Sequence, residues 1–155
     1  MESRIEKSEE LFREGYNCSQ AVFLAYADMV GIDFDTAKKL SCGFGGGMGR
    51  MRDTCGAVSA MVLLTGFFEG MVDGADAEGK KRNYALVQKL VNRFKEMYGS
   101  YNCQELLGIL AKEKSAAPEA RTEEYYKVRP CIRHILAAAR ILEEELFNEE
   151  KLDTL

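Results

Sequence analysis

Five cysteines carry most of the chemistry that this 155-residue chain offers. They are spread along the sequence as Cys18, Cys42, Cys55, Cys103 and Cys131, and no Cys-x-x-Cys pair occurs among them. Neither a zinc ribbon nor a thioredoxin-type motif is therefore indicated. Thiolates attack disulfides, reduce oxidants and bind metals, so any such site must be assembled by the fold from distant thiols.

Two of the cysteines lie in segments that resemble one another. Residues 16–20 read Tyr-Asn-Cys-Ser-Gln and residues 101–105 read Tyr-Asn-Cys-Gln-Glu. Asparagine is a good N-cap residue, and a glutamine or glutamate three positions later can reach back to the cap. This pattern places Cys18 and Cys103 at the first position of a helix.

Two more cysteines lie close to expected helix starts. Asp53 is a natural N-cap, which puts Cys55 in the first turn of the next helix. Pro130 suits a first helical position or a kink, and Cys131 follows it directly. Backbone amides at such ends favour thiolate over thiol and can lower a cysteine pKa below its free value of about 8.5.

Cys55 is predicted to be the most acidic of these thiols. Arg50 and Arg52 precede it, and their positive charges would lower its pKa further if they pointed toward it. Cys42, at the end of a short expected helix, is the cysteine least expected to join the site. The alternative for every cysteine is a role as a small buried hydrophobic residue.

His134 is the chain's single histidine and lies three residues after Cys131, on the same helix face. It is a candidate ligand or proton carrier, but a partly exposed histidine of a helical bundle is the favoured interpretation.

A glycine-rich segment, residues 43–49, contains five glycines in seven positions. A Gly-x-Gly-x-x-Gly nucleotide pattern beginning at Gly43 fails at Met48, and no Gly-Lys-Ser/Thr ending supports a P-loop. We expect these glycines to allow close backbone approach and to expose the amides of the following helix, where a small anion could bind. The candidate cofactor-binding residues are Gly45, Gly46, Gly47 and Gly56.

The elements that must position these residues are helices. Apolar residues recur at helical spacing, and no stretch alternates long enough to indicate a strand. The expected helices are one opening with a capping box at Ser3–Glu6, and those over residues 17–29, 35–42, 53–68, 80–97, from 102, and 122–147. Short connections predict an all-α, compact antiparallel bundle of about five to seven helices, in a single domain over residues 1–155.

Composition restricts the classes of function. The net charge of −4 disfavours nucleic-acid binding. The most apolar run, residues 57–68, is too short to span a bilayer, and the first residues do not resemble a signal peptide. With an odd number of cysteines, these features predict a cytoplasmic protein without membrane insertion and with reduced, metal-bound or redox-paired thiols.

Taken together, these motifs resemble the C_GCAxxG_C_C family of "putative redox-active proteins". The match consists of Asn17-Cys18, the glycine segment with Arg50, Cys55-Gly56-Ala57, and two distant cysteines. The resemblance implies that Cys18, Cys55, Cys103 and Cys131 are the characteristic cysteines. Ala60 departs from the pattern, since it stands where the family has its second glycine. A related domain occurs in a haem-bearing cytochrome of the split-Soret type, but this chain has no Cys-x-x-Cys-His and covalent haem is not implied.

Three functions remain open from the sequence. The favoured one is redox activity of Cys18, Cys55, Cys103 and Cys131, by thiol/disulfide exchange or as ligands of an iron–sulfur cluster, with an unidentified electron donor or acceptor. The second is a non-enzymatic metal site, such as zinc, formed by the same cysteines, with Cys42 and His134 less favoured as ligands. The third is a small-ligand-binding module with inert cysteines. An oxidoreductase activity and a homodimer are both compatible with the sequence.

Overall fold

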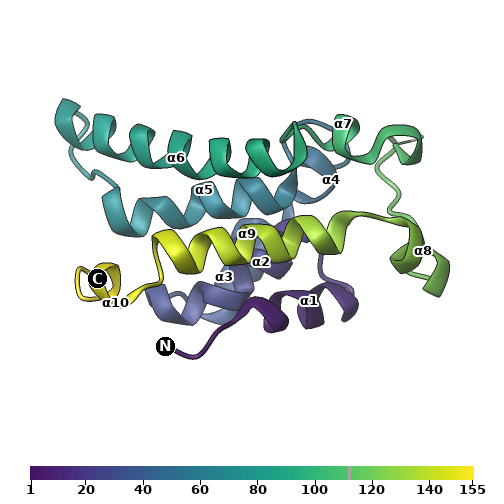
Figure 1. Ribbon diagram of the computed structural model, residues 1–155, viewed down its shortest axis with the longest axis horizontal. Helices are drawn as coiled ribbons and strands as arrows, with labels where there is room; N and C mark the ends of the chain where they lie inside the picture. Colours follow the sequence, from purple (N-terminus) through teal and green to yellow (C-terminus); the bar gives the residue numbers. More distant parts are fainter. Residues whose placement is uncertain (112) are drawn as a thin grey trace.

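The computed structural model describes residues 1–111 and 113–155, and over these residues the protein is all-α, as predicted (Figure 1). Six helices of the described chain have nine residues or more. The helices are α1 (Ile5–Arg13), α2 (Cys18–Tyr26), η1 (Ala27–Val30), α3 (Phe34–Cys42), α4 (Gly45–Met48), α5 (Gly56–Glu69), α6 (Ala77–Tyr98), α7 (Cys103–Leu107), η2 (Gly108–Leu110), α8 (Glu123–Val128), α9 (Cys131–Glu145) and α10 (Glu149–Leu152).

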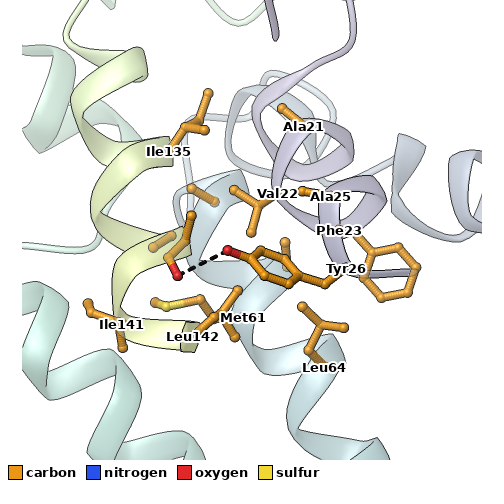
Figure 2. Packing of buried hydrophobic residues seen from close by; sticks show 14 of the residues in the cluster. Ala21, Val22, Phe23, Ala25, Tyr26, Met61, Leu64, Ile135, Ile141 and Leu142 are labelled. Carbon is orange, nitrogen blue, oxygen red and sulfur yellow. Dashed lines mark hydrogen bonds between the residues drawn. The ribbon is translucent and has the colours of Figure 1, made fainter. Parts of the chain in front are cut away.

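One continuous hydrophobic core lies between α2, α5, α9 and their neighbours. The apolar segment beginning near Ala57 forms α5, which packs against α2, α6 and α9. In Figure 2, Tyr26 of α2 is surrounded by Met61 and Leu64 of α5 and Leu142 of α9. Its hydroxyl donates to the carbonyl of α9's Ala139 at 3.2 Å, so the largest buried side chain has a polar partner. The prediction of a single domain is compatible with this core and stays a prediction.

Two expected helix caps differ from the prediction. The Ser3–Glu6 capping box is absent, because Arg4 is the N-cap of α1 and the Ser3 hydroxyl lies 3.2 Å from Glu143 Oε1. Asp53 does not cap α5 either. Cys55 itself is the N-cap residue, and the backbone of Asp53 is hydrogen-bonded to the glycine segment and to α7.

The long helix expected over residues 122–147 is two helices. α8 ends at Val128, and α9 begins at Cys131. The break has a local cause: Pro130 lacks an amide hydrogen and pushes the preceding residue out of the helical region. Arg129 accordingly has an extended backbone, with φ −77° and ψ 131°. The kink predicted at Pro130 is thus a complete interruption.

The short elements α4, α7 and α8 gather at one end of the bundle, opposite the end where both chain termini lie (Figure 1). None of the described helices is both long and apolar enough to cross a membrane.

Candidate functional site

All five cysteines line one cavity of about 470 Å³ at this end of the bundle. We call it the cysteine cavity. Its walls come from the starts of α2, α5, α7 and α9, from the glycine segment, and from the chain between α7 and α8. Each thiol is free, with no disulfide between them. Cys18, Cys55, Cys103 and Cys131 all line this cavity, and so does Cys42, which was not expected to join the site. The predicted catalytic role of Cys18, Cys55, Cys103 and Cys131 stays a prediction.

Cys18 is held by the capping box that the sequence predicted. The Asn17 carboxamide oxygen accepts the Gln20 amide at 2.9 Å, and the Gln20 side chain accepts the Asn17 amide at 3.1 Å. The Asn17 side chain also donates to the carbonyl of Cys42 at 2.8 Å, which ties the start of α2 to the end of α3. Cys18 thereby lies at the first helical position with a fixed backbone.

Gly56 makes room for the sulfur of Cys18. A Cβ atom on Gly56 would overlap Cys18 Sγ and would lie 2.8 Å from the carbonyl oxygen of Phe44. The side-chain-free first residue of α5 therefore lets α2 and α5 approach closely at the cavity. This is the physical reason for a glycine directly after Cys55.

A short backbone pairing brings Cys55 and Cys103 together. The amide of Cys55 donates to the carbonyl of Tyr101 at 2.8 Å, and the amide of Cys103 donates to the carbonyl of Asp53 at 2.6 Å. Thr54 and Asn102 form an isolated antiparallel bridge between these two bonds. This pairing, which no sequence pattern predicted, sets the start of α7 beside the start of α5.

The glycine segment wraps tightly around the cavity, as expected. Gly46 and Gly47 have positive φ angles of 66° and 70°, and a Cβ on Gly47 would lie 2.6 Å from the Cβ of Cys103. Gly45, Gly46 and Gly56 line the cavity. The predicted role of Gly45, Gly46, Gly47 and Gly56 in binding a cofactor stays a prediction.

The prediction that Cys55 is the most acidic thiol is wrong. Burial raises its pKa well above the ordinary thiol value, and the neighbouring Cys18 and Cys131 raise it further. The amides of Ala57 and Val58 at the start of α5 act in the opposite direction but do not offset this. The sequence correctly placed Cys55 at the start of a helix. However, the cost of placing a charged thiolate in the core exceeds the stabilisation of that thiolate by the helix amides.

The pKa values of Cys131 and Cys103 are raised as well. Burial raises the pKa of Cys131 to about 12, although Arg129 and Arg121 act to lower it. The pKa of Cys103 is raised by burial and lowered by Arg52, whose Nη1 lies 3.8 Å from its sulfur. Arg52 was expected to act on Cys55 and instead acts on Cys103.

His134 lines the cavity but is buried, not partly exposed as expected. Its ring packs edge-on against Tyr98 and Phe94, with centroid separations of 4.7 and 5.7 Å. Burial and the nearby Arg133 lower its pKa to about 4, so the ring is neutral at pH 7. The cavity therefore holds an uncharged imidazole.

Four arginine side chains form most of the charged part of the cavity wall, and two of them, Arg121 and Arg129, had no signal in the sequence. Arg50 and Arg52 flank the glycine segment, while Arg121 and Arg129 come from the two ends of α8. Glu119 is the carboxylate among the described lining residues and pairs with Arg129. Arginine positions far apart in sequence become a cluster only through the fold.

The described residues do not include a group of three or more Cys, His, Asp or Glu side chains arranged to hold a metal ion. Four thiols are the right donors for zinc or an iron–sulfur cluster, but the cysteines of the described chain do not form such a group. The metal-binding role of Cys18, Cys55, Cys103 and Cys131, like that of Cys42 and His134, gains no support from this geometry.

Fold and site together define the class of protein: an all-α bundle in which cysteines at helix starts line one cavity. Residues 16–145 match the family model "Putative redox-active protein (C_GCAxxG_C_C)". The chain belongs to this family, as the resemblance implied. No curated protein and no solved structure shows significant similarity to the chain. Ala60, the departure from the family motif, is fully buried in α5.

Proposed function

We propose that the protein is a thiol-based redox protein that cycles between a dithiol and a disulfide in the cysteine cavity. The observation that carries the proposal is that Cys18, Cys55, Cys103 and Cys131, distant in sequence, line the same cavity. Membership of a family described as redox-active supports the same class of function. Burial alone does not account for thiols that all face one space.

Cys18 is the attacking thiol in this proposal. It is only partly buried, whereas Cys55 and Cys103 are buried. Its charge, when ionised, raises the pKa of Cys55, Cys103 and Cys131, so it is the common neighbour of the other three. It also lies at the N-terminus of α2, a nine-residue helix whose end favours negative charge.

Cys55 is the resolving thiol. A Cβ atom on its neighbour Gly56 would overlap the Cys18 sulfur, so that sulfur packs against the residue that follows Cys55. The Cys18 thiolate attacks one sulfur of a substrate disulfide, forming a mixed disulfide and releasing one substrate thiolate, which takes up a proton. Cys55 then loses its proton and attacks Cys18 Sγ, forming the Cys18–Cys55 disulfide and releasing the second substrate thiol. Two protein thiols are oxidised, and one substrate disulfide is reduced.

The proposal is tested by redox titration of the reduced protein in dithiothreitol buffers, with alkylation of the remaining thiols and intact mass spectrometry. We expect the wild type to lose two alkylatable thiols together. Cys55→Ser should prevent this loss while the helical circular dichroism spectrum persists, because serine is similar in size but its hydroxyl does not form disulfides. Cys42→Ser is the matched control, since Cys42 is exposed, and should titrate like the wild type.

Two results would overturn the proposal. One is an unchanged thiol count across the whole titration. The other is stoichiometric zinc, or iron with sulfide, in anaerobically purified protein that is lost in Cys55→Ser together with a sharp fall in melting temperature. The second result would establish the metal-site alternative. Order of labelling by iodoacetamide is a further check: Cys42 should react before Cys55, which is buried and has a raised pKa.

A further inference from the structure

The cysteine cavity has a charge opposite to that of the whole chain. The chain carries a net charge of −4, yet Arg50, Arg52, Arg121 and Arg129 all line the cavity. Glu119 is the single carboxylate among its described lining residues, and His134 is neutral at pH 7. Burial raises the pKa values of Cys55, Cys103 and Cys131, so these three thiols are uncharged at pH 7, and the four arginines outnumber the one carboxylate.

Part of this arginine cluster has a structural role. Arg121 donates to the carbonyls of Phe12 and Tyr16, at 2.8 and 3.1 Å. Arg50 Nη1 donates to the Ser115 carbonyl at 2.9 Å and also to the Ala117 carbonyl. These bonds hold residues 115–121 across the cavity. They do not use the whole hydrogen-bonding capacity of the guanidinium groups.

Two buried arginine donors have no hydrogen-bond partner among the described residues: Nη2 of Arg50 and Nε of Arg52. Both side chains are nearly inaccessible, with residue exposures of 9% and 5%. A buried charged donor without a partner is costly, and such groups are usually satisfied by a bound anion or water. The protein therefore keeps unused cationic hydrogen-bonding capacity beside its thiols.

Glu119 lies where an external anion would be received. Its carboxylate pairs with Arg129 and lies 3.7 Å from Arg50 Nη2 and 4.0 Å from Arg52 Nη2, too far for good hydrogen bonds to either. Its side chain is 40% exposed, so it can turn toward solvent without unfolding the cavity. A ligand carboxylate could take its place with closer contacts to all three arginines.

We propose that the substrate of the cysteine cavity is a small disulfide that bears carboxylates, bound by Arg50, Arg52 and Arg129 in exchange for Glu119. This inference rests on the proposed thiol/disulfide function and names its substrate class. A cavity of about 470 Å³ is in the size range of small-molecule sites. The anchored carboxylate positions the substrate S–S bond for attack by Cys18, and the two thiols released carry the electrons away, as in the exchange above.

The test compares three disulfides of different charge as oxidants of the reduced protein: oxidised glutathione, which is anionic, bis(2-hydroxyethyl) disulfide, which is neutral, and cystamine, which is cationic. Rates are corrected for each compound's reaction with a free thiol. We expect oxidised glutathione to react about tenfold faster than the neutral compound, as one charge-assisted hydrogen bond implies. Cystamine should be slowest, and added salt should reduce the difference.

Two substitutions with opposite expected effects on the rate of oxidation by glutathione disulfide make the test more specific. Arg129→Gln should slow the reaction with oxidised glutathione about tenfold and leave the neutral disulfide nearly unchanged. Glu119→Gln removes the competing carboxylate at a half-exposed position and should accelerate oxidised glutathione alone. Should Arg129→Gln fail to fold, Glu119→Gln still decides the question.

The outcomes separate this inference from the proposed function. Equal corrected rates for all three disulfides, or an Arg129→Gln effect of equal size on all three, would mean that the arginines act on the thiols and not on the substrate. Either result overturns the inference and leaves the redox function intact. If none of the three disulfides oxidised the protein, both the substrate inference and the proposed redox function would be overturned.

Discussion

Gly56 shows how a single residue defines the site, because its missing side chain gives the Cys18 sulfur its place. An added Cβ would overlap that sulfur and would approach two backbone atoms, the Phe44 carbonyl oxygen at 2.8 Å and the Ser19 amide nitrogen at 3.1 Å. Backbone atoms cannot rotate away as side chains do, so the helices would have to move apart.

Gly56→Ala should therefore lower the free energy of unfolding by about 1–3 kcal/mol, the usual cost of overpacking. It should also impair formation of the Cys18–Cys55 disulfide, because it separates α2 from α5. Urea denaturation and the thiol titration measure the two effects.

Gly66 in the same helix is the matched control. A Cβ there would meet no atom within 4 Å, and the residue lies inside α5. Gly66→Ala should raise the free energy of unfolding by about 0.5–1 kcal/mol through helix propensity. If both glycine variants changed stability in the same direction, the steric account of Gly56 would be incorrect.

At the scale of elements, caps determine where the helices begin and hence where the thiols lie. Asn17 and Asn148 are both asparagine N-caps whose side chains accept the amide three residues later, at 2.9 and 3.0 Å. Asn17 begins α2 at the cavity, whereas Asn148 begins the four-residue α10 near the C-terminus. The two caps are chemically alike and differ in what they position.

Asn17→Ala should lower the free energy of unfolding by about 1–2 kcal/mol and should increase the alkylation rate of Cys18, because the first turn of α2 loses its cap and its bond to Cys42. Asn148→Ala should cost about 1 kcal/mol or less and leave Cys18 labelling unchanged. Urea denaturation and timed iodoacetamide labelling with peptide mass spectrometry give both readouts. Equal Cys18 rates in the two variants would disprove the positioning role of Asn17.

For the whole molecule, the burial of His134 makes global stability depend on pH. The folded pKa of His134 is lowered to about 4 from a value of 6.5 without burial. Between these values the unfolded chain binds the proton first, so acid favours unfolding. The stability from keeping this ring neutral is complete above pH 6.5 and is lost as the pH falls toward 4.

His134→Leu should remove this contribution, since leucine has a similar volume and no charge. On going from pH 7 to pH 5, the wild type should lose about 2 kcal/mol more unfolding free energy than the variant. Because the chain has only one histidine, no other imidazole contributes. Urea denaturation at both pH values is the measurement, and parallel losses in the two proteins would contradict the buried, neutral histidine.

Several features were determined by sequence alone because they depend on local interactions. The all-α class follows from helical periodicity, and the starts of α2 and α7 follow from the Asn17 and Asn102 caps. These signals act within one helical turn, so neighbouring residues are sufficient to predict them. The same local reasoning failed at Asp53, whose backbone is used by α7 and by the glycine segment.

The properties of the thiols and of the cavity charge were decided only by the tertiary structure. Cys55 has the local environment of an acidic thiol, but packing of distant helices buries it and raises its pKa. The arginine cluster brings Arg50 and Arg52 together with Arg121 and Arg129, which lie much later in the sequence. Desolvation and Coulomb interaction depend on distances in space, and spacing along the sequence does not report these distances.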